Sequence, residues 1–182
     1  LCNVVHSRKN REPRLMAVLA EHGGRIDVLE LEGPIFFGTA ENLALRLEDL
    51  LVGNASYVLR DLKRVNEIDS TGARIILAAH DKLTKRGKAL LVSGLVAHPE
   101  VAATFKDMGV TTALGAGRQF EDIDGAIEWA EEHLILSVLG DRELEGEFPL
   151  THFDVLASLS PPELATMKAL LERRVYAQGD VV

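Results

Sequence analysis

Cysteine, aromatic side chains and long apolar runs are all scarce in this chain of 182 residues. The single cysteine, Cys2, has no partner for an internal disulfide, which excludes a fold held together by disulfides. Aromatic residues make up 5% of the chain, too few for a surface that stacks nucleic-acid bases. No apolar run approaches the roughly 20 residues that cross a bilayer as a helix. With 47% hydrophobic residues, the composition favours a soluble, globular, cytosolic domain.

Positive charge is also scarce, and it is unevenly placed. The formal net charge of −8 argues against nucleic acid as the main partner. Arg8, Lys9, Arg11 and Arg14 nevertheless cluster near the start of the chain. Such a cluster is typical of the cytoplasmic flank of a membrane segment, and the alternative is a solvated basic linker. The acidic stretch over residues 121–147 is expected to be a solvated helix face followed by a polar linker.

Catalytic and metal-binding signatures are missing as well. The sequence has no Gly-x-Ser-x-Gly turn, no phosphate-binding P-loop, and no complete dinucleotide fingerprint after Gly115-Ala116-Gly117. The six histidines are dispersed without metal-ligand spacing, and His80 is expected at the surface or at a boundary. We therefore expect no enzyme activity, no cofactor and no metal ion in this chain. Because the chain begins with Leu rather than Met, we also expect it to be a piece of a longer protein.

The hydrophobic pattern predicts alternating strands and helices. Residues 26–31 alternate apolar and polar, and residues 35–37 form a second apolar run after the Gly33-Pro34 turn, so we expect an antiparallel hairpin. The later segments follow a βα order that favours parallel pairing. Further strands are expected at 57–62, 89–92 and 110–113, and helices at 39–53, 72–85, 98–109 and 121–133. The predicted fold class is α/β: a small mixed β-sheet of about five strands covered by helices, with a C-terminal helical extension.

The most informative stretch lies between the strand at 57–62 and the helix that follows it. Asp69, Ser70, Thr71 and Gly72 place an acid, two hydroxyls and a glycine at a helix N-terminus. Unpaired backbone N–H groups and the positive end of the helix dipole favour negative charge there, such as a phosphate. The missing side chain of Gly72 would let the backbone of a partner approach closely. We interpret this loop as a switch or docking site rather than a catalytic pocket.

Three interpretations of the Asp69 loop stay open. The loop is a helix cap and nothing more, or one hydroxyl is a phosphoacceptor, or the loop is a docking surface without phosphorylation. A phosphate on Thr71 would add roughly −1.5 to −2 charges and three acceptor oxygens. It would repel an acidic partner surface and recruit an arginine-lined one.

These residues carry a resemblance to a known family. The strand at 57–62 and the loop Ile68-Asp69-Ser70-Thr71-Gly72 resemble a STAS domain. That family includes the anti-sigma-factor antagonists and the cytoplasmic C-terminal domains of SulP (SLC26-type) anion transporters. In the antagonists, an Asp-Ser-Ser-Gly type motif carries the phosphorylated hydroxyl at its third position, which corresponds to Thr71. The stretch Gly33-x-x-Phe36-Phe37-Gly38 and the basic lead-in resemble the transporter branch, and the likeness covers about residues 7–137.

A second resemblance begins near the C-terminal end. Residues 153–164, 170–174 and 176–181 resemble the opening helices and first strand of a cyclic-nucleotide-binding domain. Ser160 and Pro161 suit the start of a helix there. The phosphate-binding cassette of that family has no counterpart up to Val182, so we expect no cyclic-nucleotide binding by this chain.

The resemblance implies a non-enzymatic regulatory and protein-interaction domain of a SulP-type transporter for an inorganic anion such as sulfate or bicarbonate. The domain would lie on the cytoplasmic side of the plasma (inner) membrane, as part of an integral membrane protein. Its partners would be the membrane-spanning part of the same transporter, a second copy of the domain, and a regulatory protein or nucleotide. The alternatives are a nucleotide- or partner-sensing STAS module, and a soluble phospho-switch like the anti-sigma-factor antagonists.

The same resemblance divides the chain into four parts. A juxtamembrane linker and lead-in would span residues 1–24, and the STAS domain residues 25–137. A linker would follow at 138–150, and an incomplete cyclic-nucleotide-binding-like domain would occupy 151–182.

Overall fold

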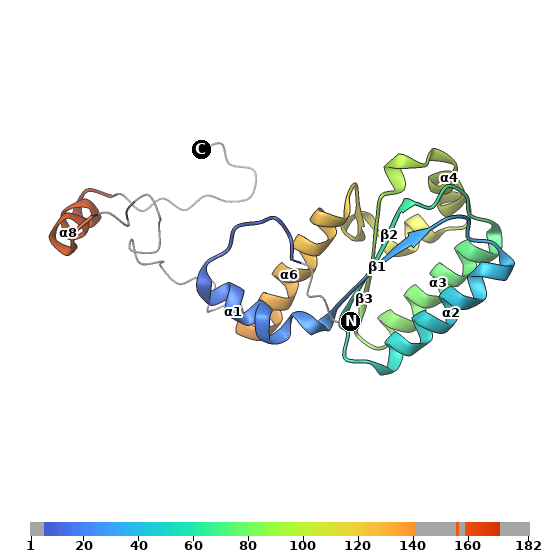
Figure 1. The fold of residues 1–182 in the computed structure, drawn as a ribbon, viewed down its shortest axis with the longest axis horizontal. Coiled ribbons are helices and arrows are strands. Elements are labelled where there is room, and N and C mark those ends of the chain that lie inside the picture. The colour runs from blue at the N-terminus through green and yellow to red at the C-terminus, as the bar shows by residue number, and fades with distance from the viewer. Residues whose placement is uncertain (1–5, 141–155, 157–158, 172–182) are drawn as a thin grey trace. The chain divides into compact units, whose positions relative to one another are not determined.

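The computed structural model describes residues 6–140, 156 and 159–171, and the chain divides into two compact units, Leu1–Gly140 and Asp141–Val182. In the first unit, strands alternate with helices (Figure 1). The strands are β1 (Ile26–Glu32), β2 (Tyr57–Arg64), β3 (Ala89–Ser93) and β4 (Gln119–Phe120). The helices are α1 (Pro13–His22), α2 (Phe37–Val52), α3 (Ser70–Thr84), α4 (Pro99–Asp107), α5 (Val110–Leu114) and α6 (Ile123–Leu139), with short 3-10 turns η1 (Gly23–Arg25), η2 (Leu95–Ala97) and η3 (Ala116–Arg118). The predicted α/β class is confirmed.

The four strands form one parallel sheet in the order β1-β2-β3-β4. Ile26 pairs with Tyr57, and Tyr57 pairs with Ala89, so the first three strands start in register. Parallel strands connected by helices place all strand ends of one kind at the same edge. The described part of the chain therefore holds a four-stranded parallel sheet, where the sequence predicted a mixed sheet of about five strands.

The predicted antiparallel hairpin at residues 26–37 is wrong. Gly33 turns the chain with a φ of 81°, but the segment after it does not fold back onto β1. Ile35 instead forms an isolated parallel bridge with Ile68, with Ile35 N–H donating to Glu67 O at 3.0 Å. Helix α2 then begins at Phe37. The apolar run that was predicted to be a strand is thus a short extended connection between β1 and α2. It lies beside the loop that follows β2.

The predicted strand at residues 110–113 is also wrong, because these residues form helix α5. Gly109 and Gly115 flank this helix with φ values of 75° and 76°, a backbone conformation that glycine adopts at no steric cost. Val110 and Leu114 are both buried, and a spacing of four residues puts both on one helix face. The last strand is β4, whose two residues pair with the end of β3.

Alternating side chains of the central strands build two cores, one on each face of the sheet. Val58 and Leu62 of β2 join the larger core, which also includes side chains of helices α2 to α5. Leu59 of β2 and Leu91 of β3 point to the other face and pack against α6. Figure 1 shows α2 and α3 on one side of the strands and α6 on the other. Each buried leucine contributes about 2 kcal/mol of transfer free energy, so the layers hold each other in place.

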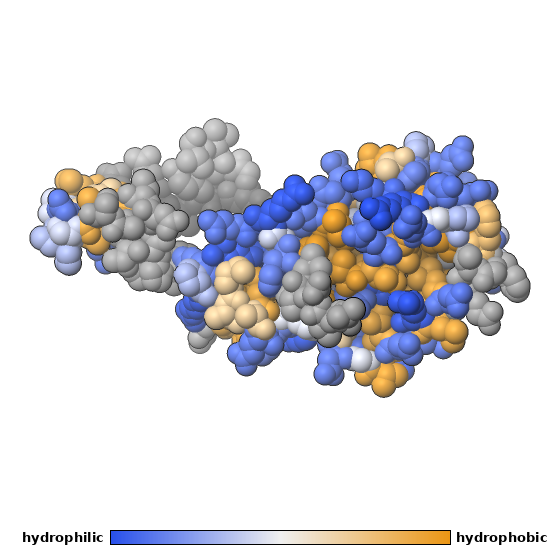
Figure 2. Space-filling model, in the orientation of Figure 1, coloured by the Kyte–Doolittle hydropathy of each residue, from blue (hydrophilic) through white to orange (hydrophobic). Residues whose placement is uncertain are grey.

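An apolar groove of about 130 Å³ runs between α2 and α3, lined by Leu47, Leu51 and Ile75 among others. Figure 2 shows apolar surface on this side of the first unit. The ion pair between Lys82 Nζ and Glu48 Oε1, at 2.9 Å, spans the same two helices. In the described ranges, none of the helices combines the length and the apolar character needed to cross a membrane.

The second unit contains helix α8 (Pro161–Leu170), with Pro161 in its first turn. Ser160 and Glu163 form a capping box, since the Glu163 side chain accepts from the Ser160 backbone N–H at 2.8 Å. This confirms the predicted helix start. Most of the region predicted to resemble a cyclic-nucleotide-binding domain, including residues 172–182, lies outside the described residues.

Candidate functional site

Helix α3 begins with an aspartate cap, followed by the two hydroxyl side chains. Asp69 is the N-cap residue, and its Oδ1 accepts a hydrogen bond from Gly72 N–H at 2.8 Å. The Asp69 carbonyl accepts from Ala73 N–H at 3.1 Å, which starts the helical ladder. Because Asp69 satisfies the free N–H of Gly72, neither Ser70 nor Thr71 is needed as the cap.

The structure brings all four predicted site residues into one turn, with different exposure. Ser70 is exposed, Asp69 and Thr71 are half-buried, and Gly72 is buried. Within the described residues, neither the Ser70 nor the Thr71 hydroxyl has a hydrogen-bond partner. Both hydroxyls therefore stand at a helix N-terminus without a structural hydrogen bond there. A role for either as phosphoacceptor remains a prediction.

Gly72 is required by the chain's own backbone. A Cβ built at this position would lie 2.8 Å from Ile35 O, Ile35 Cγ2 and Ile68 Cγ1. These distances are shorter than real Cβ contacts, and the carbonyl belongs to backbone, which cannot swing away. The expected close approach at Gly72 thus exists, but the approaching backbone is Ile35 of the same chain.

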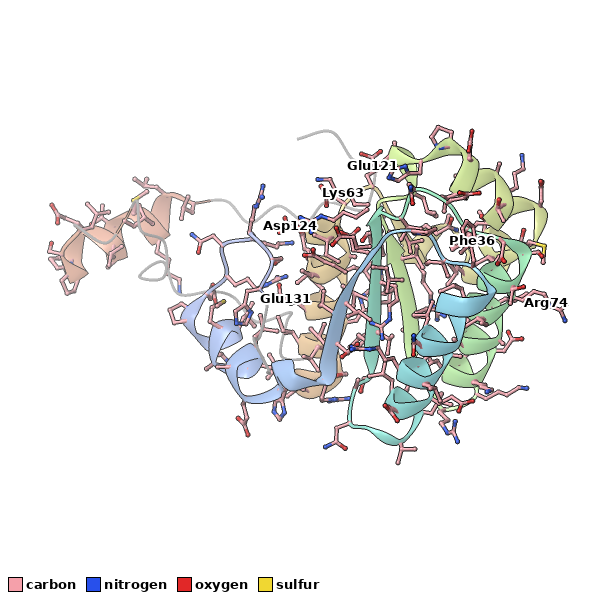
Figure 3. The ribbon with its side chains drawn as sticks, turned by 45° about the vertical axis from the view of Figure 1, so that its right-hand side comes forward. Phe36, Lys63, Arg74, Glu121, Asp124 and Glu131 are labelled. Carbon is pink, nitrogen blue, oxygen red and sulfur yellow. The ribbon has the colours of Figure 1, made fainter. Side chains whose placement is uncertain are left out.

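A polar network fixes the sheet edge beside this loop. Asp61 Oδ1 accepts from Ser93 Oγ at 2.9 Å and from Lys63 N–H at 3.3 Å. A Cβ on Gly94 would lie 2.6 Å from Lys63 N. Because glycine has no Cβ, the end of β3 can approach the end of β2 this closely. Figure 3 shows Phe36 and Lys63 at this end of the domain. Phe36 is 36% exposed, so it lies on the surface.

A second cluster lies on helix α6, where Glu131 binds the start of the described chain. We call residues 6–11 the N-terminal strap. The Glu131 side chain is only 2% exposed, yet it accepts hydrogen bonds from Ser7 Oγ at 2.5 Å and from Arg11 Nη2 at 2.9 Å. His6 Nδ1 lies 3.1 Å from Glu131 Oε1. A buried carboxylate is therefore surrounded by partners from residues more than 100 positions away in sequence.

Neighbouring carboxylates of α6 extend the contact with the strap. Lys9 Nζ lies 2.7 Å from Glu128 Oε1 and 2.5 Å from Glu132 Oε1. Arg8 N–H donates to Asp124 Oδ1 at 2.9 Å. Positions 124, 128, 131 and 132 share one helix face because they are three or four residues apart. Figure 3 shows Asp124 and Glu131 on α6, turned toward the strap.

The charge state of Glu131 is set by its partners. Burial raises the pKa of this carboxyl, but hydrogen bonds from Ser7, Arg11 and His6 outweigh burial, and its pKa is lowered. Glu131 is thus ionised at neutral pH, and the Arg11 side chain beside it is 5% exposed. Removing one partner of such a pair leaves a buried charge without compensation, which costs about 3–5 kcal/mol.

The sequence-based interpretation missed this cluster. It treated the cations near the N-terminus as lipid-facing or solvated, and the acidic stretch as a solvated face. In the structure, the cations of Lys9 and Arg11 pair with carboxylates of α6. The available signal was the opposite charge of the basic residues 8–14 and the acidic stretch 121–147, although their positions in the sequence do not by themselves show that they meet.

Two buried polar side chains were missed as well. His80 is 7% exposed, so its predicted position at the surface or at a boundary is wrong. Burial, and next the charge of Arg118, lower the pKa of His80 and leave it neutral. Arg60 is 1% exposed and donates to Asp27 Oδ2 at 2.8 Å. Arg60 Nε and His80 Nδ1 are buried without a hydrogen-bond partner in the described part of the chain. Among the described residues, no group of three or more His, Cys, Asp or Glu side chains could hold a metal ion.

Two glutaminases resemble this chain over nearly its whole length. Glutaminase 2 and Glutaminase 1 of Bradyrhizobium diazoefficiens are 30% and 27% identical over 179 and 173 residues, which is 98% and 95% of this chain. The chain spans only 28% of the length of each of these relatives.

Solved structures resemble part of this chain. A sulfate transporter family protein from Wolinella succinogenes has a TM-score of 0.53 at 30% identity, covering 61% of this chain and 88% of that one. A SulP transporter STAS domain from Vibrio cholerae has a TM-score of 0.52 at 26% identity, covering 66% and 97%. The anti-sigma factor antagonist SpoIIAA, at 17% identity and a TM-score of 0.50 over 59% of this chain and 90% of its own, shares the fold. The family model of the STAS domain matches residues 17–126. With that match over more than half of its length, this chain belongs to the STAS domain family.

Proposed function

We propose that this chain is a regulatory, non-catalytic part of a longer protein, and that it acts on the chain that precedes it. The observation that supports this most directly is the strap, because residues 6–11 are held on α6 by one buried ion pair and two exposed ones. Helix α1 packs against α6 as well. A conformational change of α6 would therefore be transmitted through the strap to the segment upstream of it.

We infer further that the longer protein is a glutaminase-type amidohydrolase. The similarity to the two Bradyrhizobium glutaminases extends over 98% and 95% of this chain. It therefore includes most of the residues outside 17–126, which the STAS family model does not match. In this proposal, the STAS domain regulates glutamine hydrolysis by a catalytic domain elsewhere in the protein.

A second candidate is the cytoplasmic regulatory domain of a SulP-type transporter for sulfate or bicarbonate, on the inner side of the plasma membrane. Its support is the 30% and 26% identity to two solved structures of that family. Those likenesses cover 61% and 66% of this chain, a smaller share than the glutaminases cover. The basic strap would then have to exchange its carboxylate partners on α6 for lipid head groups.

The Asp69 loop is the proposed contact for a partner, either a regulatory protein or a second copy of the domain. Ser70 is exposed at the first position of α3, and Thr71 is the proposed phosphoacceptor by its place in the motif. A phosphate there would change the charge of the contact without refolding the helix. A Thr71→Glu variant that binds every partner like the wild type would contradict this mechanism.

The test uses the full-length protein and two matched variants. Glu131→Gln removes the charge that holds the strap, while Glu100→Gln removes an exposed carboxylate on α4, away from the strap. We expect glutamine hydrolysis by the wild type, a changed kcat or KM in Glu131→Gln, and unchanged values in Glu100→Gln.

The contrary outcomes are distinct. A full-length protein that does not hydrolyse glutamine but carries sulfate or bicarbonate into proteoliposomes would replace the glutaminase proposal with the transporter. Kinetics of Glu131→Gln that equal those of the wild type would contradict regulation through the strap, whichever activity the protein has.

A further inference from the structure

A hollow of about 340 Å³ lies at the amino ends of the strands, the opposite sheet edge from the Asp69 loop. We call it the amino-edge hollow. The residue directly before each of the four strands lines it: Arg25 before β1, Ser56 before β2, Lys88 before β3 and Arg118 before β4. The parallel topology thus gathers three cations from distant parts of the sequence. Ser137, in the last turn of α6, also lines the hollow.

Backbone hydrogen bonds hold the base of the amino-edge hollow. Ser56 N–H donates to Arg25 O at 2.7 Å, and Ala89 N–H donates to Ser56 O at 2.8 Å, so the sheet ladder continues into the hollow. Arg25 Nη2 donates to Ser56 Oγ at 3.1 Å. Lys88 Nζ donates to Leu50 O and to Gly53 O, at 2.6 and 2.5 Å. Two of the three cations are therefore held in place by the fold itself.

The charge of the amino-edge hollow is strongly positive. No acidic side chain lines it, and in the described part of the chain none of Arg25, Lys88 and Arg118 forms an ion pair with a carboxylate. The C-terminal ends of α2, α3 and α6 lie near it and contribute about −0.5 charge each, roughly −1.5 in all. Three full positive charges exceed that sum. This excess is notable in a chain whose net charge is −8.

The positive charge of Arg118 acts on a neighbouring side chain as well. Burial, and then the positive charge of Arg118, lower the pKa of the nearby His80. Burial raises the pKa of Tyr57, so its hydroxyl keeps its proton at neutral pH and can donate to an anion. Tyr57, Ser56 and Ser137 thus add hydroxyl donors to the three cations.

We propose that the amino-edge hollow binds a small oxyanion: a phosphate, a sulfate or the carboxylate of a small metabolite. Planar guanidinium groups match such oxygens in pairs, and an ammonium adds a third charge-assisted hydrogen bond. A hollow of about 340 Å³ also has room for a small organic group beside the anion. The site does not depend on which longer protein carries the domain. Because Ser137 lies on α6, bound anion would touch the helix that also holds the strap.

The test is equilibrium dialysis of the full-length protein with radiolabelled inorganic phosphate. We expect one saturable site per chain, competed by sulfate but not by chloride at equal ionic strength. Arg118→Gln is expected to weaken binding about tenfold or more, since a charge-assisted hydrogen bond contributes roughly 1.5–3 kcal/mol. Arg74→Gln removes one exposed arginine of α3 that does not line the hollow and points away from the domain (Figure 3), and it is expected to bind like the wild type.

A second variant and a set of competitors complete the test. Arg118→Lys keeps the charge but loses the planar fork, so it is expected to fold and to bind with an affinity between those of Arg118→Gln and the wild type. Displacement by glycerol phosphate or succinate at lower concentration than by inorganic phosphate would support an organic ligand of this site, and the reverse order an inorganic one. No saturable binding, or equal binding by Arg118→Gln and wild type, would overturn the proposal.

Discussion

Helices α3 and α6 start in the same way, and the comparison shows what the local pattern means. Each begins with an aspartate three residues before a glycine, and each aspartate accepts a hydrogen bond from that glycine N–H: Asp69 from Gly72 at 2.8 Å and Asp122 from Gly125 at 2.9 Å. The surroundings differ. Gly72 is pressed against Ile35, whereas the nearest contacts of a Cβ on Gly125 are at 3.5 and 3.7 Å, an ordinary separation.

The comparison separates capping from function. An Asp-x-x-Gly start occurs twice in one domain, and capping explains it in both places. What distinguishes α3 is a pair of hydroxyls at its first two positions and a glycine that is required by packing. Helix α6 is distinguished by Glu131, further along the helix, which holds the strap. A functional assignment therefore depends on these surroundings rather than on the aspartate and glycine alone.

The largest expected effect is that of Glu131→Gln, which tests how α6 holds the strap. Glu131→Gln leaves Arg11 without its charged partner, and the docking free energy of the strap should fall by about 3 kcal/mol. That loss corresponds to roughly a hundredfold increase in strap opening. Tryptic cleavage after Arg8, Lys9 or Arg11 should accelerate accordingly, while cleavage within α3 should not change. Equal cleavage in Glu131→Gln and wild type would show that the strap is not held by this carboxylate.

Acid should release the strap of the wild type in a graded way. The pKa of Glu131 lies below its ordinary value of 4.5 in the folded protein, so the contribution of this carboxylate is fully present above pH 4.5. The contribution is lost as the pH falls through the lower, folded-state pKa. Hydrogen exchange of residues 6–12 should rise over that range in the wild type. After correction for intrinsic rates, it should rise less steeply in Glu131→Gln, where only the exposed pairs of Lys9 with Glu128 and Glu132 remain.

A smaller effect tests the packing difference between the two glycines. Gly72→Ala forces a Cβ into the Ile35 carbonyl, and overpacking of this kind costs about 1–3 kcal/mol, partly offset by the helix preference of alanine. Gly125→Ala has room and should raise the free energy of unfolding by about 0.5 kcal/mol. Urea denaturation of both variants measures the contrast. Equal effects of the same sign would mean that the two helix starts are not packed differently.

The smallest expected difference between the two helix starts tests whether their caps are equivalent. Asp69→Ala and Asp122→Ala should each lower the free energy of unfolding by about 1 kcal/mol, because each leaves one helix N–H unsatisfied. Thermal unfolding of both variants gives the comparison. A loss at Asp69 that exceeds the loss at Asp122 by 1 kcal/mol or more would show that Asp69 does more than cap its helix.

Local signals in the sequence predicted much of this fold. The strands near 57–62 and 89–92 and the helices near 72–85 and 121–133 are confirmed, because apolar periodicity and turn residues act over short distances. The hairpin failed because Ile35 is extended by a bridge to Ile68, a contact that apolar character alone does not specify. The five-residue helix α5 is too short for periodicity to separate helix from strand.

The candidate sites show the same limit. The loop at Asp69 was found because its four residues are adjacent in sequence and form one turn. Glu131 was missed because its partners lie 120 or more positions away, and no local pattern reports such a pairing. The amino-edge hollow is likewise assembled by topology, since each of its cations precedes a different strand.

The strap is covalently joined to the helix that it binds, through α1 and all four strands of the sheet. Rebinding is therefore an intramolecular event, and short tethers give effective concentrations in the millimolar range. A separate basic peptide would have to reach about that concentration to displace the strap from Glu131. The domain is thus insensitive to weak, dilute competitors, and at neutral pH a tightly binding partner or a pull on the upstream chain would be needed to release the strap.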